Sequence, residues 1–163
     1  MKTIKLSDRL LELANLIDYD ASVADIGTDH GYLPVYLAQS GYAKRIIASD
    51  ISADSLSAAR KLSKKHNVSN LIEFTVSPGL EGVEPNSVDT IIISGMGGET
   101  IIGILSDAPW TKNNEIKLIL QPQSKIDLLC KFLYDNEYEI KKTISVIDRG
   151  KNYTVFLCIH KEA

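Results

Sequence analysis

Short apolar segments alternate with helical segments along most of this 163-residue chain, and this alternation is what most restricts its fold. Runs rich in Ile, Leu, Val and Ala lie at 45–49, 88–93 and 117–120, and each precedes a segment with helical periodicity. Strands buried on both faces have this composition when they lie in a parallel sheet that helices cover on both sides. The pattern therefore predicts an α/β protein.

The remaining segments extend this prediction to seven strands. We expect helices over 7–17, 32–39, 99–105 and 124–134, with another starting near residue 52, and earlier strands over 23–26 and 71–76. Two final strands, near 138–147 and 153–160, are joined by the hairpin signal Asp148-Arg149-Gly150-Lys151-Asn152. The predicted fold is a Rossmann-like, mostly parallel seven-stranded sheet with a C-terminal antiparallel hairpin and helices on both faces. No interdomain linker is visible, so we expect residues 1–163 to form a single domain.

Composition indicates a soluble globular protein, because 44% of the residues are hydrophobic and 24% are charged. No apolar run is long enough to cross a bilayer, and Asp8 and Glu12 interrupt the apolar N-terminal segment, unlike a signal peptide. We therefore expect a cytoplasmic protein without a membrane or obligate protein partner. Cys130 and Cys158 have no metal-ligand spacing, and we expect no bound metal.

A net charge of −3 argues against a surface that grips nucleic acid over its whole extent. Lys61, Lys64 and Lys65 form a local basic cluster at the end of a predicted helix. The cluster either forms a basic patch or complements the negative end of the helix dipole.

The segment Asp25-Ile26-Gly27-Thr28-Asp29-His30-Gly31 lies where the first strand turns into a helix. Glycines at 27 and 31 allow a tight turn and a close approach to a ligand. A dinucleotide site has a glycine where this chain has Asp29, and that carboxylate would repel a pyrophosphate. Asp25 is likewise suited to a cationic amine. S-adenosylmethionine carries a sulfonium and an ammonium without phosphate, so these charges favour it over NAD.

Asp50 closes the second predicted strand, where a carboxylate can accept hydrogen bonds from ribose hydroxyls. Both cofactors contain a ribose, so Asp50 alone does not discriminate between them. Each of Asp25, Asp29 and Asp50 could instead stabilise a turn or cap a helix. This alternative is a weaker explanation for three aspartates that occur together around two glycines.

Three strings resemble the signatures of the bacterial tRNA (adenine-22-N1)-methyltransferases. They are Ala24-Asp25-Ile26-Gly27-Thr28-Asp29-His30-Gly31-Tyr32-Leu33-Pro34, Ser94-Gly95-Met96-Gly97-Gly98 and Leu118-Ile119-Leu120-Gln121-Pro122. The opening, Lys5-Leu6-Ser7-Asp8-Arg9-Leu10, is also similar, and the resemblance extends from about residue 6 to residue 159. It implies a class I methyltransferase fold and methyl transfer from S-adenosylmethionine to N1 of an adenine in the D-arm region of tRNA.

The resemblance also implies roles for individual residues. The predicted cofactor-binding residues are Asp25, Gly27, Thr28, Asp29, Gly31, Asp50, Ile51, Gly79, Leu80, Ser94 and Gly95, with Gly79 and Leu80 flanking the adenine. Met96, Gly97 and Gly98 would form the floor beneath the target base, and Gln121, Pro122 and Gln123 would contact its edge. Independently of the resemblance, methyl transfer to N1 develops positive charge on the adenine, and Asp29, with His30 second, is the candidate catalytic residue that would stabilise it. A structural turn is the alternative for 121–123, and an ordering hydrogen bond is the alternative for His30.

The sequence departs from the family at two places. Pro78 replaces an Asp or Asn whose side chain would bond the adenine amino group, and proline has neither that acceptor nor a backbone N–H. Family members continue into a helical extension, whereas this sequence ends at Ala163, so the resemblance covers the catalytic domain. These departures keep two alternatives open: a methyltransferase acting on a small molecule, and a binding module with impaired catalysis. An NAD-dependent oxidoreductase is disfavoured by Asp29.

Overall fold

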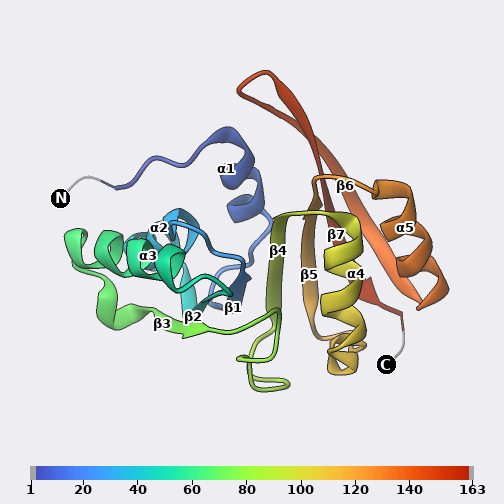
Figure 1. The fold of residues 1–163 in the computed structure, drawn as a ribbon, viewed down its shortest axis with the longest axis horizontal. Helices are drawn as coiled ribbons and strands as arrows, with labels where there is room; N and C mark the ends of the chain where they lie inside the picture. The colour runs from blue at the N-terminus through green and yellow to red at the C-terminus, as the bar shows by residue number, and fades with distance from the viewer. Residues whose placement is uncertain (1–2, 162–163) are drawn as a thin grey trace.

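The computed structural model describes residues 3–161 and contains one seven-stranded sheet (Figure 1). The strands are β1 (Ala21–Ile26), β2 (Ala43–Asp50), β3 (Glu73–Val76), β4 (Thr90–Met96), β5 (Lys117–Pro122), β6 (Tyr138–Asp148) and β7 (Lys151–His160). The helices are α1 (Asp8–Asn15), α2 (Tyr32–Ser40), α3 (Ala53–Lys65), α4 (Gly98–Ser106) and α5 (Ile126–Asp135), with 3-10 turns η1 (Ser69–Leu71) and η2 (Pro109–Thr111).

The strand order is β3-β2-β1-β4-β5-β7-β6. Strands β1 to β5 are parallel, whereas β7 is antiparallel to both of its neighbours. The chain builds outward from β1 to β3 and then returns to β4 on the other side of β1. In open α/β sheets, ligands bind at the carboxyl ends of the strands where the order reverses, which here is between β1 and β4.

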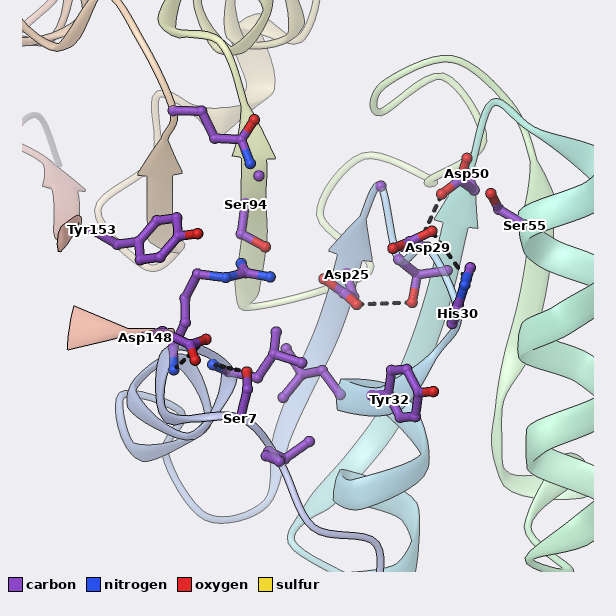
Figure 2. Close-up of a pocket in the computed structure, with 18 of the residues that line it drawn as sticks. Ser7, Asp25, Asp29, His30, Tyr32, Asp50, Ser55, Ser94, Asp148 and Tyr153 are labelled. Atoms are coloured by element: carbon purple, nitrogen blue, oxygen red, sulfur yellow. Dashed lines mark hydrogen bonds and ion pairs between the residues drawn. The ribbon is translucent and has the colours of Figure 1, made fainter. Parts of the chain in front are cut away.

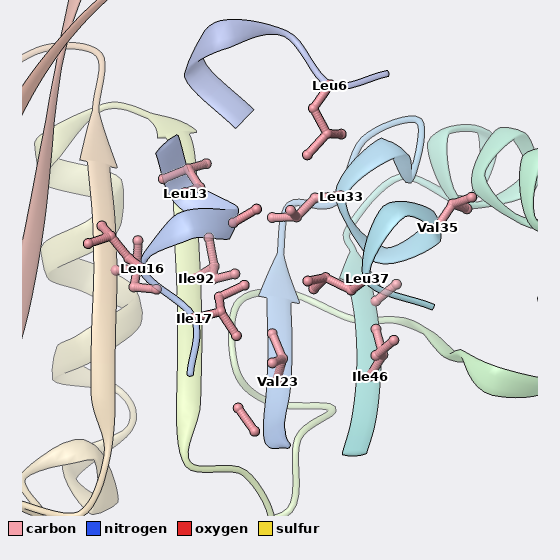
Figure 3. Close-up of a cluster of buried hydrophobic side chains, with 14 of the residues drawn as sticks. Leu6, Leu13, Leu16, Ile17, Val23, Leu33, Val35, Leu37, Ile46 and Ile92 are labelled. Carbon is pink, nitrogen blue, oxygen red and sulfur yellow. The ribbon is translucent and has the colours of Figure 1, made fainter. Parts of the chain in front are cut away.

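Two apolar clusters fill the space between the sheet and its helices. Alternate residues of one strand point to opposite faces, so Ile92 packs with α1 and α2 while Ile91 and Ile93 pack with α4 and α5. Figure 3 shows the first cluster, in which Leu13 and Leu37 lie over the sheet beside Ile92. Helices therefore cover both faces, as the continuously apolar strands predict.

Local signals predicted most helix ends correctly. The Ser7 hydroxyl accepts the N–H of Leu10 at the start of α1, and the Ser52 hydroxyl accepts the N–H of Ser55 at the start of α3. Gly41 ends α2 with φ of 64°, a conformation that favours glycine.

All seven strands differ from their predicted bounds by one to three residues at one end or both, and the third and fourth show the reason. The third was expected over 71–76, but its ladder starts at the pair Ile47–Glu73, and residues 69–71 form the turn η1. The fourth was expected over 88–93, yet pairing with β5 carries it from Thr90 to Met96. Both shifts follow from ladder pairing between strands, which the composition of a single strand does not encode. Within residues 3–161, no helix is long and apolar enough to cross a membrane.

Candidate cofactor and substrate site

A cavity of about 790 Å³ opens at the carboxyl ends of β1, β2 and β4 (Figure 2). The N-terminal segment and α1 contribute Lys5, Leu6, Ser7, Arg9 and Leu10 to its lining. The ends of β1 and β2 and the segments that follow them contribute Asp25, Gly27, Thr28, Asp29, His30, Tyr32, Leu33, Asp50 and Ser55. The rest of the lining comes from the second half of the sheet and its loops: Ser94, Gly95, Gln123, Asp148, Arg149 and Tyr153. Its volume lies within the range of small-molecule sites. The cavity occupies the position at which the strand order predicts a ligand.

The loop between β1 and α2 has no room for side chains at its two glycines. Gly27 has φ of 73°, and a Cβ there would collide with Cε of Met96. Gly31 has φ of 80°, and its Cβ would lie 2.6 Å from Cβ of Ala59 in α3. Glycine is thus required both for the backbone conformation and for close packing against β4 and α3.

Asp25 ends up almost fully enclosed at the end of β1, with 4% of its surface exposed. Its Oδ2 accepts the Thr28 hydroxyl at 2.8 Å, and no donor among the described residues reaches Oδ1. Burial raises the pKa of Asp25 to about 6, although the Thr28 hydrogen bond and the charge of Arg9 oppose this rise. The site therefore holds a carboxylate that lacks a full set of partners and would gain from a bound cation.

Asp50 and Asp29 lie together beside the same loop. Asp50 accepts the backbone N–H of Asp29 at 2.9 Å through Oδ2, and that of Ser52 at 2.9 Å through Oδ1. Each oxygen keeps a second lone pair that a ribose hydroxyl could use. Asp29 has φ of 56°, and its side chain is 74% exposed on the cavity rim. Its Oδ1 lies 3.1 Å from Nδ1 of His30, which also lines the cavity.

Arg9 is a cavity residue that the sequence motifs did not single out. Its Nη1 donates to Oε1 of Gln121 at 3.1 Å, and its guanidinium lies 5.6 Å from the centre of the Tyr153 ring. Because α1, β5 and β7 are far apart in the sequence, only the fold brings these three side chains together. The similarity of the opening Lys5–Leu10 segment to the family was the only available signal for Arg9.

Gln121 lies behind the cavity wall rather than on it, with 0% of its surface exposed. Its Oε1 accepts the N–H of Gly95 at 3.0 Å as well as the Arg9 bond, and its Nε2 donates to the carbonyl of Pro122. The amide therefore fixes the loop after β4. Gln123, which is exposed, is the member of the 121–123 string that lines the cavity.

Several other predicted site residues also do not line this cavity. Ile51 is 74% exposed and lies outside the lining, as do Gly31, Met96, Gly97, Gly98 and Pro122. Gly79 and Leu80 border a separate cavity of about 460 Å³ between the 78–85 loop and α4, together with Pro78. The structure thus assembles Asp25, Gly27, Thr28, Asp29, His30, Asp50, Ser94, Gly95 and Gln123 around one space and leaves the others outside its lining.

Comparison with known proteins agrees with this arrangement. A protein-family model described as a methyltransferase domain matches residues 6–156. The tRNA (adenine(22)-N(1))-methyltransferase of Bacillus subtilis is 32% identical over 157 residues, which are 96% of this chain and 66% of that protein. The chain therefore spans about two thirds of the length of that relative.

Solved structures give the same result. The B. subtilis m1A22 tRNA methyltransferase TrmK has a TM-score of 0.90 and 32% identity, covering 97% of this chain and 68% of its own. M. capricolum TrmK, in complex with the cofactor product S-adenosyl-homocysteine, has a TM-score of 0.85 and 30% identity, covering 96% and 70%. The predicted fold class is confirmed, and the chain belongs to the methyltransferase-domain proteins and, among them, to the family of the bacterial tRNA (adenine(22)-N(1))-methyltransferases.

Proposed function

We propose that this protein transfers the methyl group of S-adenosylmethionine to N1 of an adenine in the D-arm region of tRNA. The observation that carries the proposal is the acidic wall of the cavity, where the enclosed carboxylate of Asp25 lies next to the loop that Asp50 orders. Such a wall suits a cationic donor and repels the pyrophosphate of a dinucleotide.

The residues present fit the methionine end of the cofactor. Asp25 offers its free Oδ1 to the ammonium group, and Arg9 places a cation within the same cavity for the carboxylate. Asp50 keeps lone pairs for the ribose hydroxyls. Thr28 holds Asp25 in position through its hydroxyl.

When bound, S-adenosylmethionine supplies an electrophilic methyl group on a sulfonium. The N1 atom of an unpaired adenine has a free lone pair, so the protein has to align the base rather than remove a proton from it. The N1–carbon bond forms as the sulfur–carbon bond breaks, and the positive charge passes from sulfur to the adenine ring. Asp29, on the cavity rim, is positioned to stabilise that charge, and His30 holds its carboxylate.

A methyl-transfer assay with a matched pair of variants tests this function. The protein is incubated with labelled S-adenosylmethionine and a tRNA transcript, and label in the RNA is counted against label in small metabolites. We expect the wild type to label tRNA and Asp25→Asn to lose at least about tenfold in activity, because a neutral amide replaces the carboxylate that faces the ammonium group.

Asp54→Asn is the control, since Asp54 is an exposed carboxylate in the first turn of α3 and lies outside the cavity lining. It should retain wild-type activity. Label confined to small metabolites would reject tRNA as the substrate, and full activity of Asp25→Asn would reject the proposed cofactor site.

A further inference from the structure

The two sides of the cavity carry opposite charges. Asp29 and Asp50 lie on one side, and Figure 2 shows Ser7, Asp148 and Tyr153 across the space from them. On this second side, Arg149 contributes an exposed cationic side chain to the lining. Asp148 is the acid nearest to it along the chain, and its Oδ2 lies 3.4 Å from the backbone N of Arg9 at the start of α1. The acidic side suits the cationic methyl donor, which leaves the basic side for an anionic group.

The hairpin of β6 and β7 extends beyond the sheet on this side. Pairing of β7 with β5 is limited to residues 156–158, whereas its pairing with β6 continues to Asp148 and Lys151. The outer part of the hairpin is therefore a two-stranded ribbon, which Figure 1 shows reaching past the ends of the neighbouring strands. A bond of 2.6 Å from the Ser145 hydroxyl to Asn152 ties the two strands together near the tip.

The tip of this ribbon presents cations without acidic partners. Arg149, with φ of 51°, and Gly150, with φ of 80°, form its two-residue turn, and Lys151 follows. Within residues 3–161, neither Arg149 nor Lys151 forms an ion pair, although four other Lys and Arg side chains do. Ile147 is 69% exposed beside them. An exposed ribbon with two cations outside ion pairs and an apolar side chain suits a partner that has both negative charges and flat apolar groups.

We propose that Arg149 and Lys151, here called the basic rim, bind the phosphodiester backbone of RNA beside the target nucleotide. RNA would then enter from the hairpin side, with the target base passing Tyr153 toward the acidic wall. This inference rests on the proposed function and assigns its RNA-binding surface. A local pair of cations at the hairpin tip is compatible with a net charge of −3 for the whole chain.

Two variants with the same change in charge test the basic rim. The first is Arg149→Glu with Lys151→Glu. The control is Lys64→Glu with Lys65→Glu, which reverses two exposed lysines in the last turn of α3, outside the cavity lining. Binding of a fluorescent tRNA transcript is measured by anisotropy at several salt concentrations, and S-adenosylmethionine binding is measured by calorimetry. Thermal unfolding verifies that both variants are folded.

The rim variant should bind tRNA at least about tenfold more weakly, and the slope of log affinity against log salt should fall by about 2. Its S-adenosylmethionine affinity should stay within about twofold of wild type, as should the tRNA affinity of the control. Rim and control variants that bind tRNA equally well would overturn the inference. RNA binding is measured without methyl transfer, so a wild type that binds tRNA through the rim but transfers no methyl group would reject only the proposed function.

Discussion

The protonation state of Asp25 should control cofactor binding. Burial raises the pKa of this carboxyl to about 6 in the ligand-free protein, and an ammonium group binds only its ionised form. The dissociation constant for S-adenosylmethionine should be constant above about pH 7 and rise up to about tenfold per pH unit below pH 6. Calorimetric titrations between pH 5 and 8 measure this. Asp25→Asn should bind weakly with a flatter pH profile, and an unaltered profile would assign the titration to another group.

The same carboxyl should lower the stability of the ligand-free protein at neutral pH. Because its pKa is higher in the folded state than the ordinary 3.8, the folded protein binds more protons between about pH 4 and pH 6. Its contribution is therefore most favourable below pH 4, and about 3 kcal/mol of it is lost as the pH rises through 6. Asp25→Asn should raise the unfolding free energy at pH 8 and change it little at pH 4. Urea unfolding of the wild type and Asp25→Asn measures the difference in unfolding free energy at each pH. The same difference at pH 4 and pH 8 would contradict a raised pKa for Asp25.

Asp29 should act in the chemical step more than in cofactor binding. Asparagine tolerates the left-handed backbone that Asp29 adopts, so Asp29→Asn should keep the loop intact. Single-turnover methyl transfer should slow by about tenfold or more, while the dissociation constant for S-adenosylmethionine changes little. Asp54→Asn again serves as the control. Unchanged turnover in Asp29→Asn would remove this carboxylate from the proposed mechanism.

At the scale of residues, the sequence identified the parts of the site that are contiguous in the chain. Asp25, Gly27 and Thr28 share one loop, and Asp50 follows the neighbouring strand, so their proximity could be predicted from parallel pairing alone. Arg9 and Tyr153 reach the cavity only through the packing of α1 and β7, which no local pattern encodes. Gln121 was expected at the cavity and instead is enclosed behind it, because its amide satisfies Gly95 and Arg9.

At the scale of elements, the two glycines that flank α2 should differ in their tolerance of alanine. Both have positive φ, but a Cβ at Gly31 would collide with Ala59 of α3, whereas at Gly41 it would meet nothing within 4 Å. Gly41→Ala should cost only the backbone strain of about 1–2 kcal/mol, and Gly31→Ala should cost at least about 2 kcal/mol more. Urea unfolding of the two variants measures the difference. Equal costs would show that α3 moves aside without penalty.

The helices were easier to predict than the sheet. Ser7, Ser52 and Gly41 mark helix ends through local hydrogen bonds or backbone conformation, which a short sequence window contains. The length of the β6–β7 ribbon and the shortened start of β3 depend on which strands pair and over how many residues. Those pairings depend on residues far apart in the sequence. The local signal at residues 148–152 predicted the antiparallel hairpin, and its two-residue turn lies at Arg149 and Gly150.

At the scale of the whole molecule, the sheet brings a cationic-donor site and a basic rim to opposite sides of one cavity. Asp25 and Asp50 come from the first two strands, and the rim comes from the β6–β7 turn and the start of β7. Alternation of apolar strands and helices predicted the parallel sheet. The distribution of charge around the cavity could not be predicted in this way, because it depends on the strand order, in which β7 lies between β5 and β6. The central claim joins these parts: a methyl group passes from the acidic side to an adenine held from the basic side.

The most direct measurement is mass spectrometry of nucleosides from a tRNA transcript incubated with this protein and S-adenosylmethionine carrying a deuterated methyl group. The proposed function predicts deuterated N1-methyladenosine, located in the D-arm region by nuclease fragments, and its absence from a transcript whose D-arm adenines are replaced. A deuterated methyl group on another base or at another atom of adenine, or none in the RNA, would contradict it.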